Sequence, residues 1–118
     1  FEEYMMDDAQ IMVVSYGMTS RIVKSAIRKA REEGIKAGLF RPITLWPFPE
    51  KNLNESIEKV KEILVVELSA GQMIEDVKLI NNGRLPVSFH GRMGGMTPSV
   101  EDIYDEIKKL HDRLSVKA

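Results

Sequence analysis

The sequence predicts an α/β fold, with helices packed on both faces of a mostly parallel sheet. Short apolar runs, typical of strands covered on both faces, alternate along the chain with segments whose apolar residues recur at helical spacing. The links between them are short, and right-handed crossovers then lead to parallel pairing. With 118 residues, 43% of them hydrophobic, the chain can bury one core without disulfides. We expect a single domain over residues 1–118, belonging to a longer subunit because the chain starts at Phe1 and enters patterned sequence at once.

The expected elements alternate regularly along the chain. In order they are a strand at 11–16, a helix at 20–33, a strand at 37–40, a helix at 50–61, a strand at 62–68, a helix at 69–80, a strand at 87–90 and a helix from 97 to the end. The strands at 11–16 and 62–68 are the strongest, because few polar residues interrupt their apolar runs. Residues 1–6 can add a short strand at an edge of the sheet.

Capping residues set the expected helix ends. Thr19 or Ser20 suits the N-cap of the first helix, and a glycine follows its last turn. Pro49 suits the first position of the second helix, because its missing N–H and fixed φ are tolerated there. Ser69 and Gln72 have capping-box spacing at the start of the third. The first helix also carries a basic row, which we interpret as a solvated face. This row comprises Arg21, Lys24, Arg28, Lys29 and Arg31.

Charge and composition exclude several classes of function. Lys and Arg total 17 against 18 for Asp and Glu, so no excess of charge favours nucleic acid or a membrane surface. Without cysteine, the chain supplies no disulfide, no thiolate for an iron–sulfur cluster and no thiol nucleophile. No apolar run approaches the ~20 residues of a membrane span, and the first residues lack a signal-peptide pattern. We expect a cytoplasmic protein with neither nucleic-acid nor membrane partners.

The segment 42–49, Pro-Ile-Thr-Leu-Trp-Pro-Phe-Pro, holds three of the five prolines and the only tryptophan. Three prolines fix φ and remove backbone donors, so this segment is neither a helix nor a central strand. Two interpretations stay open for Trp46 and Phe48. They pack onto the core of the domain, or they form an apolar docking surface, since aromatic rings carry a large contact area in both settings.

The remaining unusual residues follow the strands, at the edge of a parallel sheet where ligand sites collect. The loop at 16–20 has one glycine, too few for a dinucleotide fingerprint, and an ordinary turn is favoured over a phosphate site. Gly94 and Gly95 with Arg92 and His90 form either a turn or an anion-binding nest, and the turn is favoured.

Glu67 ends an apolar strand. A buried carboxylate needs a backbone amide, a cation or a neighbouring chain, so a structural anchor is favoured over a base. His90 has no second ligand at metal-binding spacing. No nucleophile elbow or acidic pair is present, and no self-sufficient active site emerges from the residues alone.

Four segments together resemble the α subunit of 2-oxoacid:ferredoxin oxidoreductases. They are the strand at 11–16 with Gly17, the run Gly-Ile-Lys-Ala-Gly-Leu-Phe-Arg-Pro-Ile-Thr-Leu-Trp-Pro-Phe-Pro at 34–49, Val-Val-Glu-Leu-Ser-Ala-Gly-Gln-Met at 65–73, and Gly-Arg-Met-Gly-Gly at 91–95. The resemblance extends from residue 8 to the last helix. The final motif is most similar to branched-chain, 2-oxoisovalerate members, and 2-oxoglutarate members are close relatives.

The resemblance implies a C-terminal domain with the transketolase C-terminal fold, a three-layer α/β/α sandwich that can include one antiparallel edge strand. Enzymes of this family decarboxylate a 2-oxoacid on thiamine diphosphate, pass electrons through an iron–sulfur cluster to ferredoxin and release an acyl-CoA. It also implies that thiamine diphosphate and its magnesium ion are held by other domains and by the β subunit. No catalytic, cofactor or metal residue is therefore assigned to this chain.

Two hypotheses follow from different classes of function. In the first, the chain is a non-catalytic domain that packs against the catalytic domain of its own subunit and against the thiamine-binding β subunit. Its expected contact residues are Trp46, Phe48, Glu67, Gln72, His90 and Arg92. In the second, it is an autonomous module whose Tyr16 and Arg92 loops bind a phosphate-bearing ligand such as CoA. A free-standing flavodoxin-like signalling domain ranks last, because no acidic cluster follows the first strand.

Overall fold

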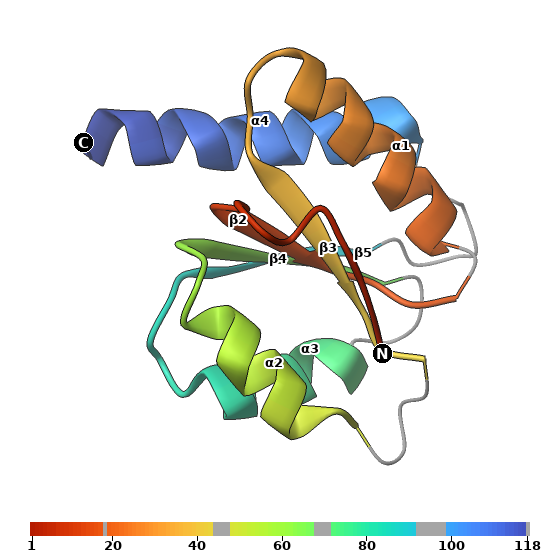
Figure 1. The fold of residues 1–118 in the computed structure, drawn as a ribbon, viewed down its shortest axis with the longest axis vertical. Coiled ribbons are helices and arrows are strands. Elements are labelled where there is room, and N and C mark those ends of the chain that lie inside the picture. The colour runs from red at the N-terminus through yellow and green to blue at the C-terminus, as the bar shows by residue number, and fades with distance from the viewer. Residues whose placement is uncertain (18, 44–47, 68–71, 92–98, 118) are drawn as a thin grey trace.

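A computed structural model of the chain shows one five-stranded sheet between two layers of helices (Figure 1). The structure describes residues 1–17, 19–43, 48–67, 72–91 and 99–117. The strand order is β1-β3-β2-β4-β5, with β1 antiparallel to β3 and every other pair parallel. The strands are β1 (Glu2–Tyr4), β2 (Ile11–Val14), β3 (Ala37–Arg41), β4 (Glu62–Glu67) and β5 (Val87–Gly91). The predicted mostly parallel α/β fold and its antiparallel edge strand are confirmed.

Helices cover both faces of the sheet. Figure 1 shows α1 (Thr19–Glu32) and α4 (Val100–Lys117) on one face, and α2 (Glu50–Ile57) and α3 (Gln72–Asn81) on the other. Because strand side chains alternate between faces, β2 feeds both cores. Val13 packs under α1 and α4, whereas Met12 packs toward α2 and α3. Every residue of β2 and β4 is buried, which explains why these strands appear as unbroken apolar runs.

Several predicted helix ends are corrected by the structure. Pro49 is the N-cap of α2, with φ −76° and ψ 68°, and does not occupy the first helical position. The helix ends at Ile57 and not at residue 61. The chain has to turn there, because the Lys61 N–H donates to the Gln10 carbonyl and β4 begins at the next residue. The expected capping pair at Ser69 lies outside the described residues, and the third helix begins at 72.

The last helix begins with a reciprocal cap that was not predicted from the sequence. The Ser99 hydroxyl accepts from the Asp102 N–H at 3.1 Å, and the Asp102 carboxylate accepts from the Ser99 N–H at 3.2 Å. This is a capping box with Asp in place of the usual Glu or Gln. The expected start at residues 97 and 98 lies outside the described part of the chain, and α4 is assigned from Val100.

A buried ion pair fastens α4 to the amino end of β4. The Glu62 side chain is completely buried, and Arg113 donates to both of its oxygens, through Nε at 2.9 Å and through an NH2 group at 2.5 Å. The Glu62 carboxylate raises the pKa of Arg113 above its ordinary value, so the guanidinium stays charged. The two-pronged geometry matches carboxylate to guanidinium. This contact fixes where α4 crosses the sheet.

Candidate functional site

The carboxyl ends of the four parallel strands meet at one edge of the sheet, where Glu67 ends β4 and His90 lies near the end of β5. The pairing of β4 with β5 sets Glu67 opposite Gly91 and Val66 opposite His90. Glu67 and His90 therefore end neighbouring strands but face opposite sides of the sheet, because Glu67 contacts α3 and His90 contacts α4. We call the six predicted contact residues the carboxyl-edge surface; they are Trp46, Phe48, Glu67, Gln72, His90 and Arg92.

Glu67 is buried, with 2% of its surface exposed. Both of its carboxylate oxygens lie 3.1 Å from the main-chain N of Met73, in the first turn of α3. A helix N-terminus presents free N–H groups and a partial positive charge, so a carboxylate is stabilised there. The expectation that Glu67 meets a backbone amide is confirmed. Its position is that of an anchor for α3.

His90 is half-buried between β5 and α4. Its Nδ1 lies 3.9 Å from the Glu106 carboxylate, and 17% of its side chain is exposed. Its Nε2 is buried and has no hydrogen-bond partner among the described residues. Glu106 was not connected with His90 from the sequence, because the two residues meet only once α4 has crossed the sheet. The pair supplies one carboxylate and one imidazole, which is fewer than the three or four protein ligands of a typical zinc site.

The other members of the carboxyl-edge surface differ in what the structure shows. Phe48 is partly buried and packs against the core beneath α2 and α3, which agrees with the core-packing interpretation of this residue. Gln72 is the first residue of α3. Trp46 and Arg92 lie outside the described residues, as do Gly94 and Gly95, for which the sequence favours a turn over an anion-binding nest. The roles of these residues as contacts stay predictions.

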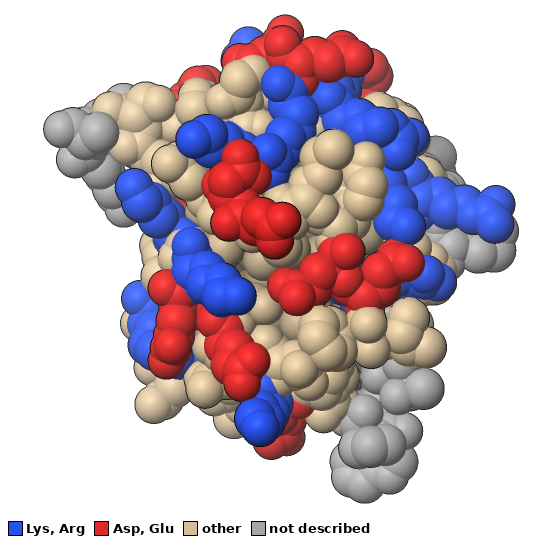
Figure 2. Space-filling view, in the orientation of Figure 1, with Lys and Arg blue, Asp and Glu red and all other residues tan. Residues whose placement is uncertain are grey.

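A hollow of about 590 Å³ lies at the ends of β2 and β3, beside the start of α1. We call it the basic hollow, and its lining comprises Gly17, Ser20, Arg21, Lys24 and Arg41. Glu2 on β1 reaches the same place, with its Oε1 3.0 Å from the Lys24 ammonium and 3.6 Å from the Arg41 guanidinium. Figure 2 shows Lys and Arg side chains gathered over α1.

These ion pairs also shift the Glu2 carboxyl group. The Lys24 hydrogen bond is the main cause that lowers the pKa of Glu2 below its ordinary value; burial opposes it, and Arg41 adds a lesser lowering effect. Glu2 is therefore a carboxylate at neutral pH. It neutralises one of the three cations that line the basic hollow.

The basic hollow was not predicted from the sequence. The basic row of the first helix was expected to be a solvated face, but its members have different environments in the structure. Lys29 pairs with Glu101, Arg31 pairs with Asp8, and Lys24 turns toward the hollow. A signal was present, because Arg21 follows one strand and Arg41 ends the next one along the chain. Parallel neighbours bring such residues to the same edge of a sheet.

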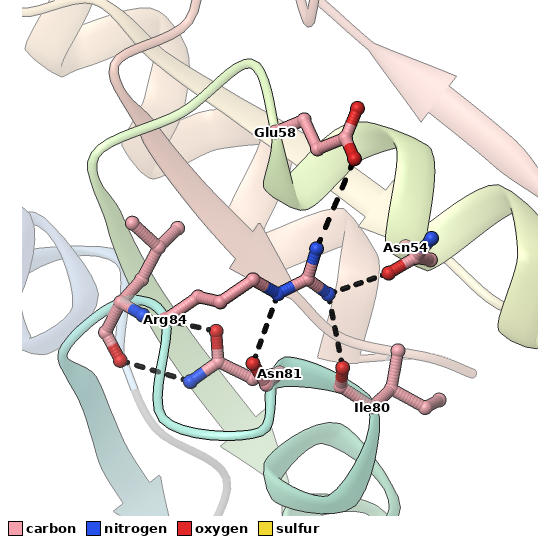
Figure 3. A network of polar contacts seen from close by, with 6 residues as sticks. Asn54, Glu58, Ile80, Asn81 and Arg84 are labelled. Carbon is pink, nitrogen blue, oxygen red and sulfur yellow. Dashed lines mark hydrogen bonds and ion pairs between the residues drawn. The ribbon is translucent and has the colours of Figure 1, made fainter.

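A second hollow, of about 490 Å³, lies between α2 and α3. Its neighbour Arg84 is fully engaged within the fold (Figure 3). The guanidinium donates to the Asn54 side chain at 2.5 Å and to the main-chain carbonyls of Ile80 and Asn81 at 3.0 and 3.1 Å. It also lies 4.0 Å from the Glu58 carboxylate. These contacts tie the two helices together and leave Arg84 in a structural role.

Metal chemistry finds no support in the described part of the chain. No three His, Cys, Asp or Glu side chains there come together in a way that would hold a metal ion. Likewise, no helix among the described residues is long and apolar enough to span a bilayer. The chain contains no cysteine, so an iron–sulfur cluster would take no thiolate from it.

The fold places the chain among transketolase-like α/β domains. The structure superposes on a split-gene transketolase, solved as an inactive beta4 tetramer, with a TM-score of 0.76 over 92% of this chain and 40% of that chain, at 16% identity. It also superposes on a 2-oxoglutarate:ferredoxin oxidoreductase from Magnetococcus marinus, solved with 2-oxoglutarate, coenzyme A and succinyl-CoA bound. There the TM-score is 0.71 over 86% of this chain and 18% of that chain, at 20% identity.

Sequence comparison resolves the family within this fold. The pyruvate:ferredoxin oxidoreductase core domain II family matches residues 9–103. The chain belongs to this family, which is domain II of the α subunit of 2-oxoacid:ferredoxin oxidoreductases. The resemblance inferred from the four sequence segments is thereby confirmed.

Curated relatives are similar over most of this chain. It is 46% identical to the ketoisovalerate oxidoreductase subunit VorB of Methanothermobacter marburgensis over 110 residues, which is 93% of this chain and 31% of VorB. It is 40% identical to the 2-oxoglutarate synthase subunit KorA of the same organism over 101 residues, which is 86% of this chain and 27% of KorA. The chain thus spans less than a third of the length of either relative.

Proposed function

We propose that this chain is the non-catalytic domain II of a 2-oxoacid:ferredoxin oxidoreductase, which converts a 2-oxoacid to an acyl-CoA by oxidative decarboxylation. The identity of 46% with a ketoisovalerate oxidoreductase subunit supports this assignment. Branched-chain 2-oxoacids are therefore the favoured substrates of the whole enzyme, and 2-oxoglutarate is the next. Within that enzyme, the chain would position neighbouring domains and subunits.

The observation that supports this proposal is the contact of the Glu67 carboxylate with the N-terminus of α3. This carboxylate is the buried acid at the carboxyl edge, where an α/β enzyme would place reactive groups. Both of its oxygens face the Met73 amide, which supports a role in holding α3 rather than in proton transfer. The remaining groups of the carboxyl-edge surface are then contact residues, with aromatic side chains supplying apolar area and polar ones fixing orientation.

The cofactors of the whole enzyme would lie outside this chain. Thiamine diphosphate with its magnesium ion and an iron–sulfur cluster are the groups expected of the family, and the described residues form no cluster of His, Cys, Asp or Glu that would hold a metal ion. The proposed partners are the catalytic domain of the same subunit and the thiamine-binding β subunit. Ferredoxin is the proposed electron acceptor of the complete assembly.

The Trp46→Ala substitution tests the packing role. In the full-length enzyme it removes the largest aromatic contact of the carboxyl-edge surface, so we expect weaker assembly of the subunits on gel filtration. The same substitution should change the unfolding free energy of the chain much less. Leu79→Ala is the matched control, because Leu79 lies on α3 with 77% of its surface exposed and outside this surface. Normal assembly of the Trp46 variant, or an equal defect in the control, would refute the proposal.

The second candidate function is an autonomous module that binds a phosphate-bearing ligand such as CoA. One observation favours it, namely the basic hollow beside the Tyr16 loop. Calorimetry with CoA and with thiamine diphosphate tests this function. Heat with CoA alone would support a CoA module, whereas the absence of heat with millimolar CoA would remove it.

A further inference from the structure

The basic hollow contains hydrogen-bond donors that have no acceptor in the part of the chain that the structure describes. The Nε of Arg41 is buried and has no acceptor among the described residues. Buried N–H groups are nearly always paired in folded proteins, so this guanidinium donor is available to an acceptor from outside the described residues. The Arg21 guanidinium lines the same hollow, and the described residues offer it neither an ion pair nor a hydrogen bond.

The charge balance of the hollow defines the kind of acceptor that it fits. Arg21, Lys24 and Arg41 contribute three positive charges, and Glu2 contributes one negative charge, so three minus one leaves two positive charges. A phosphate monoester carries close to two negative charges at neutral pH. A guanidinium group can donate two hydrogen bonds to two phosphate oxygens. A phosphate has enough oxygens to accept from both arginines, whereas a single carboxylate has only two oxygens. The volume of about 590 Å³ lies within the range of small-molecule sites.

The position of the hollow agrees with this chemistry. In open α/β sheets, ligands bind beyond the carboxyl ends of the strands, next to the point where successive connections leave on opposite faces. Here α1 follows β2 on one face, and α3 follows β4 on the other, as Figure 1 shows. This point lies between β2 and β4, and the loop after β2, with Gly17, adjoins it, whereas the rest of the hollow lies on the β3 side. Strand β3, the neighbour of β2, brings Arg41 to the same edge.

We propose that the basic hollow is a binding site for the phosphate group of a small molecule, held mainly by Arg21 and Arg41. Glu2 occupies part of the site in the free protein, and the incoming phosphate takes over its contacts with Lys24 and Arg41. This proposal deepens the second candidate function, which rests on the same hollow, and it is independent of the packing role, because no residue of the hollow belongs to the carboxyl-edge surface. Failure of one proposal leaves the other untouched.

Titration calorimetry of the full-length protein with inorganic phosphate, adenosine 3′-monophosphate and adenosine tests the site. Arg41→Met should weaken binding of both phosphate compounds by about tenfold or more, the loss of one charged hydrogen bond. Arg28→Met is the matched control. Arg28 lies on the same helix as Arg21 and contacts Tyr4 and Ser25 outside the hollow. The Arg28→Met variant should therefore bind both phosphate compounds as tightly as the wild type. Comparison between variants cancels any phosphate site elsewhere in the protein.

A second variant keeps the test informative if Arg41→Met fails to fold. Glu2→Gln removes the competing carboxylate and should tighten phosphate binding about threefold or more, in line with the strength of an exposed ion pair. Tighter binding of the adenosine monophosphate than of inorganic phosphate would identify a nucleotide as the source of the phosphate. Equal binding of both would identify free phosphate. The proposal would be overturned if adenosine bound as tightly as adenosine 3′-monophosphate. It would also be overturned if Arg41→Met, Glu2→Gln and the wild type bound phosphate with the same affinity.

Discussion

The pair between Glu62 and Arg113 allows a stability prediction with a defined size. Arg113→Met leaves a completely buried carboxylate without its cation. Removing one partner of a fully buried pair costs about 3–5 kcal/mol, but 44% of the Arg113 side chain is exposed, and solvent screening reduces this cost. We therefore expect a loss of about 2–3 kcal/mol in the free energy of unfolding. For a chain of 118 residues, this lowers the melting temperature by about 10 °C.

Urea unfolding of the chain measures this loss, because urea does not screen the charges as guanidinium salts do. Lys109→Met is the matched control on the same helix, since its pair with Glu106 at 3.6 Å is exposed and should contribute less than about 0.5 kcal/mol. Adding Glu62→Gln to Arg113→Met should restore part of the stability, because no buried charge then remains. An Arg113 variant as stable as the control, or a double variant no better than the single, would refute the reasoning.

Three further predictions concern the helix ends and the response to acid. Glu67→Gln should cost about 1–3 kcal/mol in unfolding free energy, because the first turn of α3 loses a charged acceptor; unchanged stability would show that the neutral amide suffices. Ser99→Ala should cost about 1 kcal/mol by removing the cap of α4, with Ser99→Asp as the variant expected to retain the cap. The hydrogen bond from Arg31 lowers the pKa of Asp8 below its model-compound value of 3.8, so this contact stabilises the fold above that pH and is lost as the pH falls through the folded pKa. Unfolding curves of wild type and Asp8→Asn should differ at pH 7 and converge near pH 2; a constant difference would contradict this.

Much of the fold is predictable because local patterns and the final packing agree. The apolar runs of β2 and β4 are buried on both faces in the structure, as continuous hydrophobic strands require. Helix ends are less predictable, since several solutions satisfy the same local rule. Pro49 suits either the first turn or the position before it, and the structure uses the second. Ser99 shows that a cap is easily overlooked when Asp replaces the expected Glu.

The site is only partly predictable for a different physical reason. The fate of Glu67 follows from its own surroundings, because a buried carboxylate at a strand end lies next to the helix that begins there. The basic hollow depends instead on strand order, which no local pattern specifies. Arg21 and Arg41 belong to different elements, and they share a hollow only because β3 pairs with β2. The contact between His90 and Glu106 likewise requires α4 to cross the sheet.

The proline-rich segment connects the two surfaces proposed for this chain. Arg41, directly before it, lines the basic hollow on the α1 side, whereas Phe48, near its end, packs against the core under α2 and α3. Pro42 is buried and Pro49 caps α2, so both ends of the segment are fixed to the fold, and proline restricts φ at each. The phosphate that we propose at Arg41 would therefore act on one end of a segment whose other end leads into α2.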